Sequence, residues 1–145
     1  MRAPILGGNT GEKIGALIQG LFKAASVLIL RKKKTIFEKI ARREIPATLV
    51  HEEEDFLAFK DVNPQAPVHV LIVPKRVIPG ISGGMPGDAE LLGRMLLASK
   101  QIAQKLGIFE SGYRLVINHG SDAGESVPHL HIHLLGGRAM AWPPG

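Results

Sequence analysis

Three histidines alternate with apolar residues near the C-terminus, in the order His-Leu-His-Ile-His from residue 129 to residue 133. Alternate side chains of a β-strand share a face and stand about 6.6 Å apart. We therefore expect a strand over residues 127–135 that carries His129, His131 and His133 in one row. The residues that alternate with them should enter the core, namely Leu130, Ile132 and Leu134. Imidazole, with an ordinary pKa near 6.5, can serve as nucleophile, proton carrier or metal ligand.

These three uses of the histidine row remain open on the residues alone. Zinc sites can use histidines two apart on a strand, but a row that ligated zinc completely would need the outer two rings to converge. A purely structural role would be an unusual use of a whole polar row. The chain contains no cysteine, which excludes disulfides, a thiolate nucleophile and cysteine-ligated metal.

The positive charge of the chain is confined to its beginning. The net charge is +5, of which residues 1–34 carry +6 while the remainder sums to −1. A protein that binds nucleic acid generally should carry its basic residues on the folded body, because its affinity comes from neutralising phosphates. We therefore expect no general nucleic-acid binding.

The same first 34 residues predict one amphipathic helix. Apolar residues recur from Ile14 to Leu28 with the spacing of a single helical face, but the stretch is too short and too polar for a membrane span. It could be an organelle presequence, a membrane-surface anchor in which Arg31 to Lys34 reach anionic lipid, or an extension packed on the body. The expected location is intracellular: cytoplasmic, or organellar (mitochondrion or plastid) if residues 1–34 are a presequence.

Residues 35–145 have the pattern of one mixed domain. Thr35 with Glu38 forms a capping-box pattern for a short helix through Arg43, and residues 88–106 predict one long helix. Strands are expected over 48–51 and 56–61, which should form a hairpin, and over 68–73, 113–118 and 127–135. This order predicts an α+β fold with a mostly antiparallel sheet.

Several segments beyond the histidine row resemble one known family. They are residues 35–40 (Thr-Ile-Phe-Glu-Lys-Ile), 61–69 (Asp-Val-Asn-Pro-Gln-Ala-Pro-Val-His), 73–75 (Val-Pro-Lys), 135–138 (Leu-Gly-Gly-Arg) and 142–145 (Trp-Pro-Pro-Gly). Together with the row they resemble the histidine-triad (HIT) superfamily, and within it the histidine-triad nucleotide-binding (HINT) branch. The resemblance covers residues 35–145 almost without gaps. The Trp-Pro-Pro-Gly ending separates this branch from the dinucleoside polyphosphate hydrolases.

The resemblance implies a fold, an assembly and an activity. The fold would be a five-stranded antiparallel sheet with two helices. Two copies would form a homodimer with a continuous ten-stranded sheet, which places Trp142 near the partner's site. The activity would be hydrolysis of purine nucleoside phosphoramidates or aminoacyl-adenylates with release of AMP-type nucleotides. Neither a metal nor an organic cofactor would be required.

The resemblance also assigns roles to four histidines. His131 would attack the α-phosphorus and form a nucleotidyl-histidine that water then hydrolyses. His133 would contact the phosphate, and His129 would support the row through hydrogen bonds. His69 would orient the nucleophile and favour its reactive tautomer.

Further residues would hold the nucleotide. By resemblance, Ser126 and Asn118 would contact the phosphate or the leaving group, and the backbone amides of the Gly124 to Ser126 turn could bind the anion. Asp61 would accept hydrogen bonds from the ribose hydroxyls. The base pocket would be lined by Ile36, Phe37, Ile40, Phe59 and Val62. Without the resemblance these apolar residues would be ordinary core and Asp61 an ordinary turn residue.

The chain departs from the family pattern at four positions. Glu125 stands where glutamine is common, His119 where glutamate is frequent, and Lys60 and Val77 where histidines are frequent. A Glu125 carboxylate that points inward would repel phosphate and favour cationic leaving groups, whereas one that points outward would matter little. Two other functions stay open: zinc binding through the same histidines, and a non-enzymatic protein whose bound nucleotide regulates a partner.

Overall fold

The computed structural model describes residues 10–29 and 33–145, and the chain divides into two units at Lys33/Lys34. In the first unit, helix α1 (Thr10–Ile29) forms where the apolar periodicity predicts it. Its side chains at Ile14, Leu17, Ile18 and Leu21 are between 48% and 69% exposed. Among the described residues, no helix is long and apolar enough to cross a membrane. Arg31 and Lys32, two of the residues expected to reach anionic lipid, lie outside the described part, so the three roles considered for this segment stay predictions.

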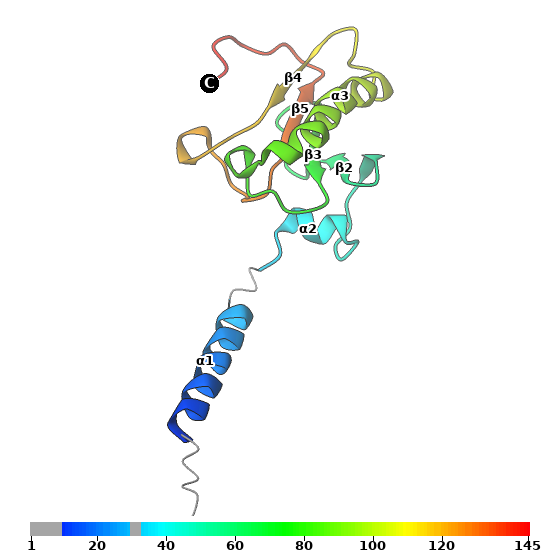
Figure 1. Cartoon of the computed structure of the whole chain (residues 1–145). Coiled ribbons are helices and arrows are strands. Elements are labelled where there is room, and N and C mark those ends of the chain that lie inside the picture. The colour runs from blue at the N-terminus through cyan, green and yellow to red at the C-terminus, as the bar shows by residue number, and fades with distance from the viewer. Residues whose placement is uncertain (1–9, 30–32) are drawn as a thin grey trace, which may run out of the picture. The chain divides into compact units, whose positions relative to one another are not determined.

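The second unit contains one five-stranded antiparallel sheet, as expected (Figure 1). Its strands are β1 (Leu49–Glu52), β2 (Phe56–Lys60), β3 (Val68–Pro74), β4 (Tyr113–Val116) and β5 (Ile132–Gly136). Their order across the sheet is β1-β2-β3-β5-β4. The predicted hairpin is confirmed, since β1 pairs with β2 across the acidic turn. Because β5 lies between β3 and β4 in the sheet, the strand that carries His133 is next to β3, which carries His69.

Two helices accompany the sheet. Helix α3 (Ala89–Lys105) agrees with the predicted long helix to within one residue at each end. Helix α2 (Ile36–Ala41) is capped by Thr35, whose hydroxyl accepts a hydrogen bond of 3.0 Å from the Glu38 amide. It ends two residues earlier than expected, because Arg43 adopts a φ of +60°, a left-handed conformation that cannot continue the helix. Short 3₁₀ turns occupy Ile81–Gly83, Pro86–Asp88 and Ser121–Ala123.

The two faces of the sheet bury different clusters. One cluster includes residues of α3 together with Val70, Ile72, Ile132 and Leu134, and Figure 1 shows α3 lying along the sheet. The other cluster joins α2 to the opposite face and contains Phe37, Ile40, Leu57, Phe59, Leu71 and Val73. Because side chains alternate along a strand, His69 and His133 share the α2 face with Leu71. Helix α2 therefore packs on the face that carries these two histidines.

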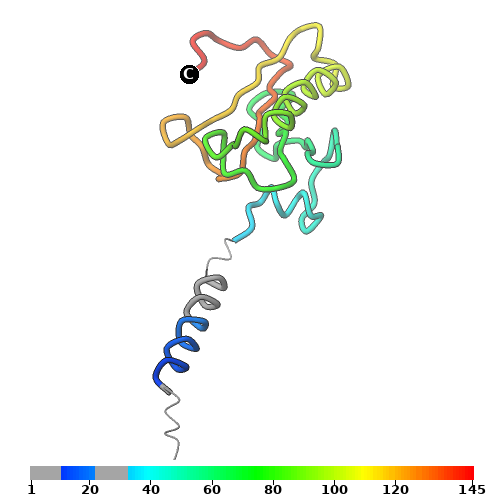
Figure 2. Tube along the Cα trace, in the orientation of Figure 1, coloured from blue at the N-terminus to red at the C-terminus, as the bar shows by residue number. Residues whose placement is uncertain are grey.

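The last strand begins later than predicted. The sequence predicted a strand from residue 127, whereas β5 begins at Ile132. Pro128 has no amide hydrogen, the His129 amide bonds to the Val127 carbonyl at 2.8 Å, and the Leu130 amide bonds to the Ile78 carbonyl at 2.6 Å. These hydrogen bonds join residues 127–131 to a turn and to the loop at Ile78 instead of to a neighbouring strand. Residues 127–131 form the end of the long loop between β4 and β5, drawn in orange in Figure 2. The predicted burial is nevertheless confirmed for the alternating apolar residues Leu130, Ile132 and Leu134.

Candidate active site

His129 is a fully buried structural support. Its Nε2 lies 2.8 Å from the Pro74 carbonyl, which can only accept, so Nε2 carries the hydrogen. Its Nδ1 lies 2.7 Å from the Thr35 hydroxyl, which therefore donates to it. Burial lowers the pKa of His129 and keeps the ring neutral, against the opposing effect of the Pro74 hydrogen bond. One hydroxyl thus both caps α2 and determines the tautomer of His129.

His131 has one ring nitrogen, Nε2, that makes no hydrogen bond with the described residues. Its Nδ1 donates a hydrogen bond of 2.7 Å to the backbone carbonyl of His129. In the neutral ring the lone pair then resides on Nε2, which is the arrangement a nucleophilic imidazole needs. The ring is buried and packs edge-on against Phe37 and against His133, with centroids 5.1 Å and 4.9 Å away.

A relay of hydrogen bonds fixes the tautomer of His133. The Gln65 amide donates to Nδ1 of His69 at 3.0 Å, so the neutral His69 ring carries its hydrogen on Nε2. That nitrogen lies 2.9 Å from Nδ1 of His133, which accepts. The remaining hydrogen of His133 is therefore on Nε2, where it is available as a donor.

Burial keeps this relay neutral. Desolvation and repulsion from His131 and His69 lower the pKa of His133 to about 4. Desolvation also lowers the pKa of His69 and outweighs the attraction of Asp61, whose Oδ2 lies 3.4 Å from His69 Nε2. Because His69 is neutral, this last contact is a long polar contact and not an ion pair.

The predicted partner of His69 was wrong. We expected His69 to orient His131, but it bonds to His133, and the carbonyl of His129 orients His131. The strand register explains the difference: Leu71 pairs with His133, so His69 lies diagonally across from His133 on the same face. Two further contacts were not predicted. The Gln65 backbone amide donates to His69, and a backbone amide has no side-chain signal in the sequence. Thr35 was predicted only as a helix cap, but its hydroxyl also donates to His129.

The residues predicted to hold the nucleoside line one pocket of about 250 Å³. Ser126 lies at the same pocket. Asp61 accepts a hydrogen bond of 2.8 Å from the Asn63 amide through Oδ1, as a turn residue would, and its carboxylate keeps further acceptor capacity. The predicted residues in this lining are Ile36, Phe37, Ile40, Phe59, Asp61 and Val62. Their proposed roles remain predictions, but the fold does gather them.

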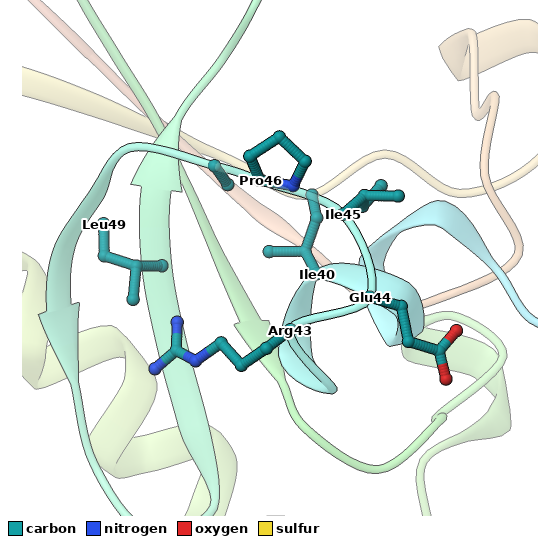
Figure 3. A pocket seen from close by; sticks show the side chains of 7 residues that line it. Ile40, Arg43, Glu44, Ile45, Pro46 and Leu49 are labelled. Carbon is teal, nitrogen blue, oxygen red and sulfur yellow. The ribbon is translucent and has the colours of Figure 1, made fainter.

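A larger neighbouring pocket of about 420 Å³ contains none of the four histidines (Figure 3). It lies between the end of α2 and the start of β1, and Ile40, Ile45, Pro46 and Ala47 belong to both pockets. Arg43 and Glu44 are the charged residues of its lining. None of the four histidines lines the 250 Å³ pocket either, but Phe37, whose ring packs against His131, lines it together with Asp61 and Ser126. His69 lines a third pocket of about 340 Å³, which shares Lys60 and Asp61 with the 250 Å³ pocket.

The loop between β4 and β5 changes one expectation. The Gly124 amide donates to the Ser121 carbonyl at 3.0 Å, and the Glu125 amide donates to the Gly120 carbonyl at 3.1 Å. Two of the three amides expected to bind an anion are thus already used within the turn. Asn118 is half-buried two residues beyond Val116, which pairs with His133, so it lies at the end of the sheet from which His131 departs.

The positions that depart from the family pattern differ in their surroundings. Lys60 lines the 250 Å³ pocket at the end of β2, and Val77 is 40% exposed. His119 and Glu125 face each other, with Nδ1 of His119 3.7 Å from a carboxylate oxygen of Glu125. Glu125 lines a separate pocket of about 180 Å³ together with Ser126.

Comparison with known proteins shows the family to which the chain belongs. The HIT domain model matches residues 42–140. A HIT-like protein of Synechocystis is 58% identical over 111 residues, which cover 77% of this chain and 96% of that protein. The 14 kDa zinc-binding protein of Zea mays is 49% identical over 126 residues, 85% of this chain and 97% of that protein.

Solved structures show the same relationship. A HIT family hydrolase of Legionella pneumophila is similar with a TM-score of 0.75 and 52% identity, covering 77% of this chain and all of that one. A histidine triad nucleotide-binding protein of Candida albicans is similar with a TM-score of 0.64 and 30% identity, covering 76% and 83% of the two chains. The family model spans well over half of the chain, and these similarities cover most of the relatives' length. The chain belongs to the histidine-triad (HIT) family.

Proposed function

We propose that the protein hydrolyses purine nucleoside phosphoramidates or aminoacyl-adenylates and releases a nucleoside monophosphate. The observation that carries this proposal is the pair of ring nitrogens left available by the hydrogen bonds. Nε2 of His131 keeps a lone pair because Nδ1 donates to the His129 carbonyl, and Nε2 of neutral His133 keeps a hydrogen because Nδ1 accepts from His69. A nucleophile and a hydrogen-bond donor thus occupy adjacent rings, 4.9 Å apart.

The reaction would proceed in two displacements at phosphorus. The lone pair of His131 Nε2 forms a P–N bond to the α-phosphorus while the bond to the leaving amine or carboxylate breaks, and an amine leaves after taking up a proton. Water then attacks the nucleotidyl-histidine: its oxygen forms the new P–O bond while the bond from phosphorus to His131 Nε2 breaks. The proton that water loses passes to solvent and balances the proton taken up by the amine, and the nucleoside monophosphate is released. This divides one difficult hydrolysis into two easier steps.

His133 would stabilise the charge on the phosphoryl oxygens through its Nε2 hydrogen. Its low pKa, about 4, keeps it a neutral donor over the physiological pH range, so it stays available in one protonation state. His129 would act indirectly, because its buried ring anchors the backbone whose carbonyl orients His131.

The 250 Å³ pocket would receive the nucleoside. Phe37 and Phe59, with ring centroids 5.7 Å apart, offer apolar area to a purine, and Asp61 at the pocket edge offers a carboxylate to the ribose hydroxyls. Hydrogen bonds to a charged group are worth about 1.5–3 kcal/mol each, so Asp61 would favour ribonucleotides.

Trapping the covalent intermediate tests this mechanism. Rapid acid-free quenching after mixing with adenosine 5′-phosphoramidate, followed by mass spectrometry, should show an adenylyl group on His131. The variant His131→Ala should carry none, whereas His51→Gln, which changes a histidine packed against Phe56 outside the site, should still be labelled. Labelling at another residue would contradict the assignment of the nucleophile.

Metal binding is a second candidate function, favoured by a specific cluster. Asp61, His69 and His133 offer three ligand atoms within 4.8 Å of one another, the number that open zinc sites use. The cluster differs from the expected histidine row, because only His133 belongs to both. A metal there would replace the hydrogen bond from His69 to His133, so it would compete with the relay that prepares His133 as a donor. Elemental analysis of the purified protein distinguishes the two functions.

We also propose a homodimer. Strand β4 is an edge of the sheet, so a second copy could continue the sheet there. Several large apolar side chains are exposed on α3, after β4 and near the C-terminus: Leu96, Leu97, Ile117 and Trp142, the last at 83%. Light scattering after gel filtration should give twice the chain mass of 15.6 kDa, and a monomer would refute this assembly.

A further inference from the structure

Glu125 closes the loop that leads into Ser126. Its backbone amide donates to the Gly120 carbonyl at 3.1 Å, and its carboxylate accepts from the Gly120 amide at 2.8 Å. The same pair of residues is thus joined in both directions across the 3₁₀ turn Ser121–Ala123. Gly120 and Gly124 make this closure possible, because they adopt φ values of +78° and +71° that other residues rarely take.

The Glu125 side chain also fits against a second segment. A Cβ at Gly80 would lie only 2.8 Å from a Glu125 carboxylate oxygen, so the absence of a side chain there leaves room for the carboxylate. Gly80 lies two residues after Ile78, whose carbonyl accepts a hydrogen bond from the Leu130 amide, and Leu130 precedes His131. The Glu125 side chain therefore lies against the backbone at both Gly120 and Gly80, and it is only 19% exposed.

Ser126 itself lies between two cavities. It belongs to the lining of the 250 Å³ pocket with Phe37 and Asp61, and to the lining of the 180 Å³ pocket with Pro79 and Glu125. A phosphoryl group attacked by His131 would have its nucleoside on the first side and its leaving group on the second. The position of Ser126 thus decides whether its hydroxyl can reach the reacting group.

We propose that Glu125 is a positioning residue for Ser126, acting through its hydrogen bond to the Gly120 amide. The inference rests on the proposed hydrolase function, which it extends to this loop. It gives the carboxylate at this position a role, because one of its oxygens accepts a hydrogen bond from the Gly120 amide. His119 adds only a polar neighbour at 3.7 Å, and its side chain is 57% exposed.

Two variants separate the hydrogen bond from the charge. Glu125→Ala removes the acceptor, and we expect kcat with adenosine 5′-phosphoramidate to fall about tenfold with KM changed less than about twofold, since only the reacting group loses its contact. Glu125→Gln keeps an acceptor oxygen of the same reach and loses the charge, and it should stay within about threefold of the wild type. His119→Ala is the matched control and should stay within about twofold. Equal losses in Glu125→Ala and Glu125→Gln would overturn the hydrogen-bond role.

A double-mutant cycle shows whether Glu125 acts through Ser126. In a Ser126→Ala background, Glu125→Ala should lower kcat by less than about twofold further, because the group it positions is gone. A full additional tenfold loss would overturn the proposal and indicate a general structural defect. Hydrogen exchange of the Gly120 amide gives a readout that does not need turnover: it should accelerate in Glu125→Ala and not in Glu125→Gln. Unchanged exchange refutes the loop closure, whereas a wild-type chain without turnover refutes the hydrolase function.

Discussion

Acidification should destabilise this protein through its buried histidines. The folded structure lowers the pKa of His133 to about 4, while the unfolded chain has the ordinary value of 6.5. Between these values the unfolded state binds the proton and the folded state does not. The contribution of neutral His133 to the unfolding free energy is therefore fully present above pH 6.5 and is lost as the pH falls toward 4. His69 and His129 contribute in the same direction, because burial lowers the pKa of both.

The magnitude for His133 follows from the span of pH. One pH unit between the two pKa values corresponds to about 1.4 kcal/mol, so moving from pH 7 to pH 5 should remove about 2 kcal/mol of unfolding free energy through His133. Urea unfolding at the two pH values measures the total loss. The variant His133→Gln cannot titrate at this position, and the loss between pH 7 and pH 5 should shrink by about 2 kcal/mol.

The refuting results are equally specific. An unfolding free energy that is independent of pH between 7 and 5 would contradict the burial argument. A His133 ring whose NMR signals titrate near pH 6.5 would contradict the relay, because a neutral His133 that accepts from His69 is what makes it a donor toward phosphate.

Three substitutions extend these tests. Thr35→Val removes the cap of α2 and the hydrogen-bond donor to buried His129, so urea unfolding should show an unfolding free energy lower by about 2–4 kcal/mol. Thr35→Ser keeps the hydroxyl and should retain most of the stability. Equal losses in the two variants would refute the dual role of the hydroxyl. Asp61→Asn should weaken AMP binding about tenfold in calorimetry but leave 2′,3′-dideoxy-AMP nearly unchanged, whereas equal losses would show that Asp61 does not bind the ribose. Ile132→Ala should cost about 2–5 kcal/mol in the same unfolding assay, because a fully packed side chain leaves a cavity, and a negligible change would contradict the core assignment.

Much of the fold was predictable because local patterns and tertiary packing agree. The alternation that buries Leu130, Ile132 and Leu134 is preserved, and the long helix α3 agrees with its predicted limits to within one residue. The limits of β5 were not predictable from alternation, because residues 127–131 follow the same period without pairing to a strand. Their hydrogen bonds go to Val127 and Ile78, and the latter is a contact across more than fifty residues that no local pattern reports.

The site was predictable in its residue types and less so in its connections. The alternating pattern predicted the histidine row, and the family resemblance supplied His69 and the pocket residues, which the fold brings together in the case of the pocket. It did not supply the partners that decide chemistry: the Gln65 amide on His69, the Thr35 hydroxyl on His129 and the Gly120 amide on Glu125. Two of these three partners are backbone amides, whose positions depend on register and turn geometry and carry no signature of their own in the sequence.

The most direct test of the central claim is AMP release from adenosine 5′-phosphoramidate by the full chain, measured with a chelator present and beside His131→Ala and His51→Gln. We expect turnover that resists the chelator, disappears in His131→Ala and persists in His51→Gln. A folded wild-type protein that binds AMP without releasing it from the phosphoramidate would contradict the hydrolase and favour a nucleotide-regulated interaction protein. Turnover that the chelator abolishes would contradict the metal-free histidine mechanism.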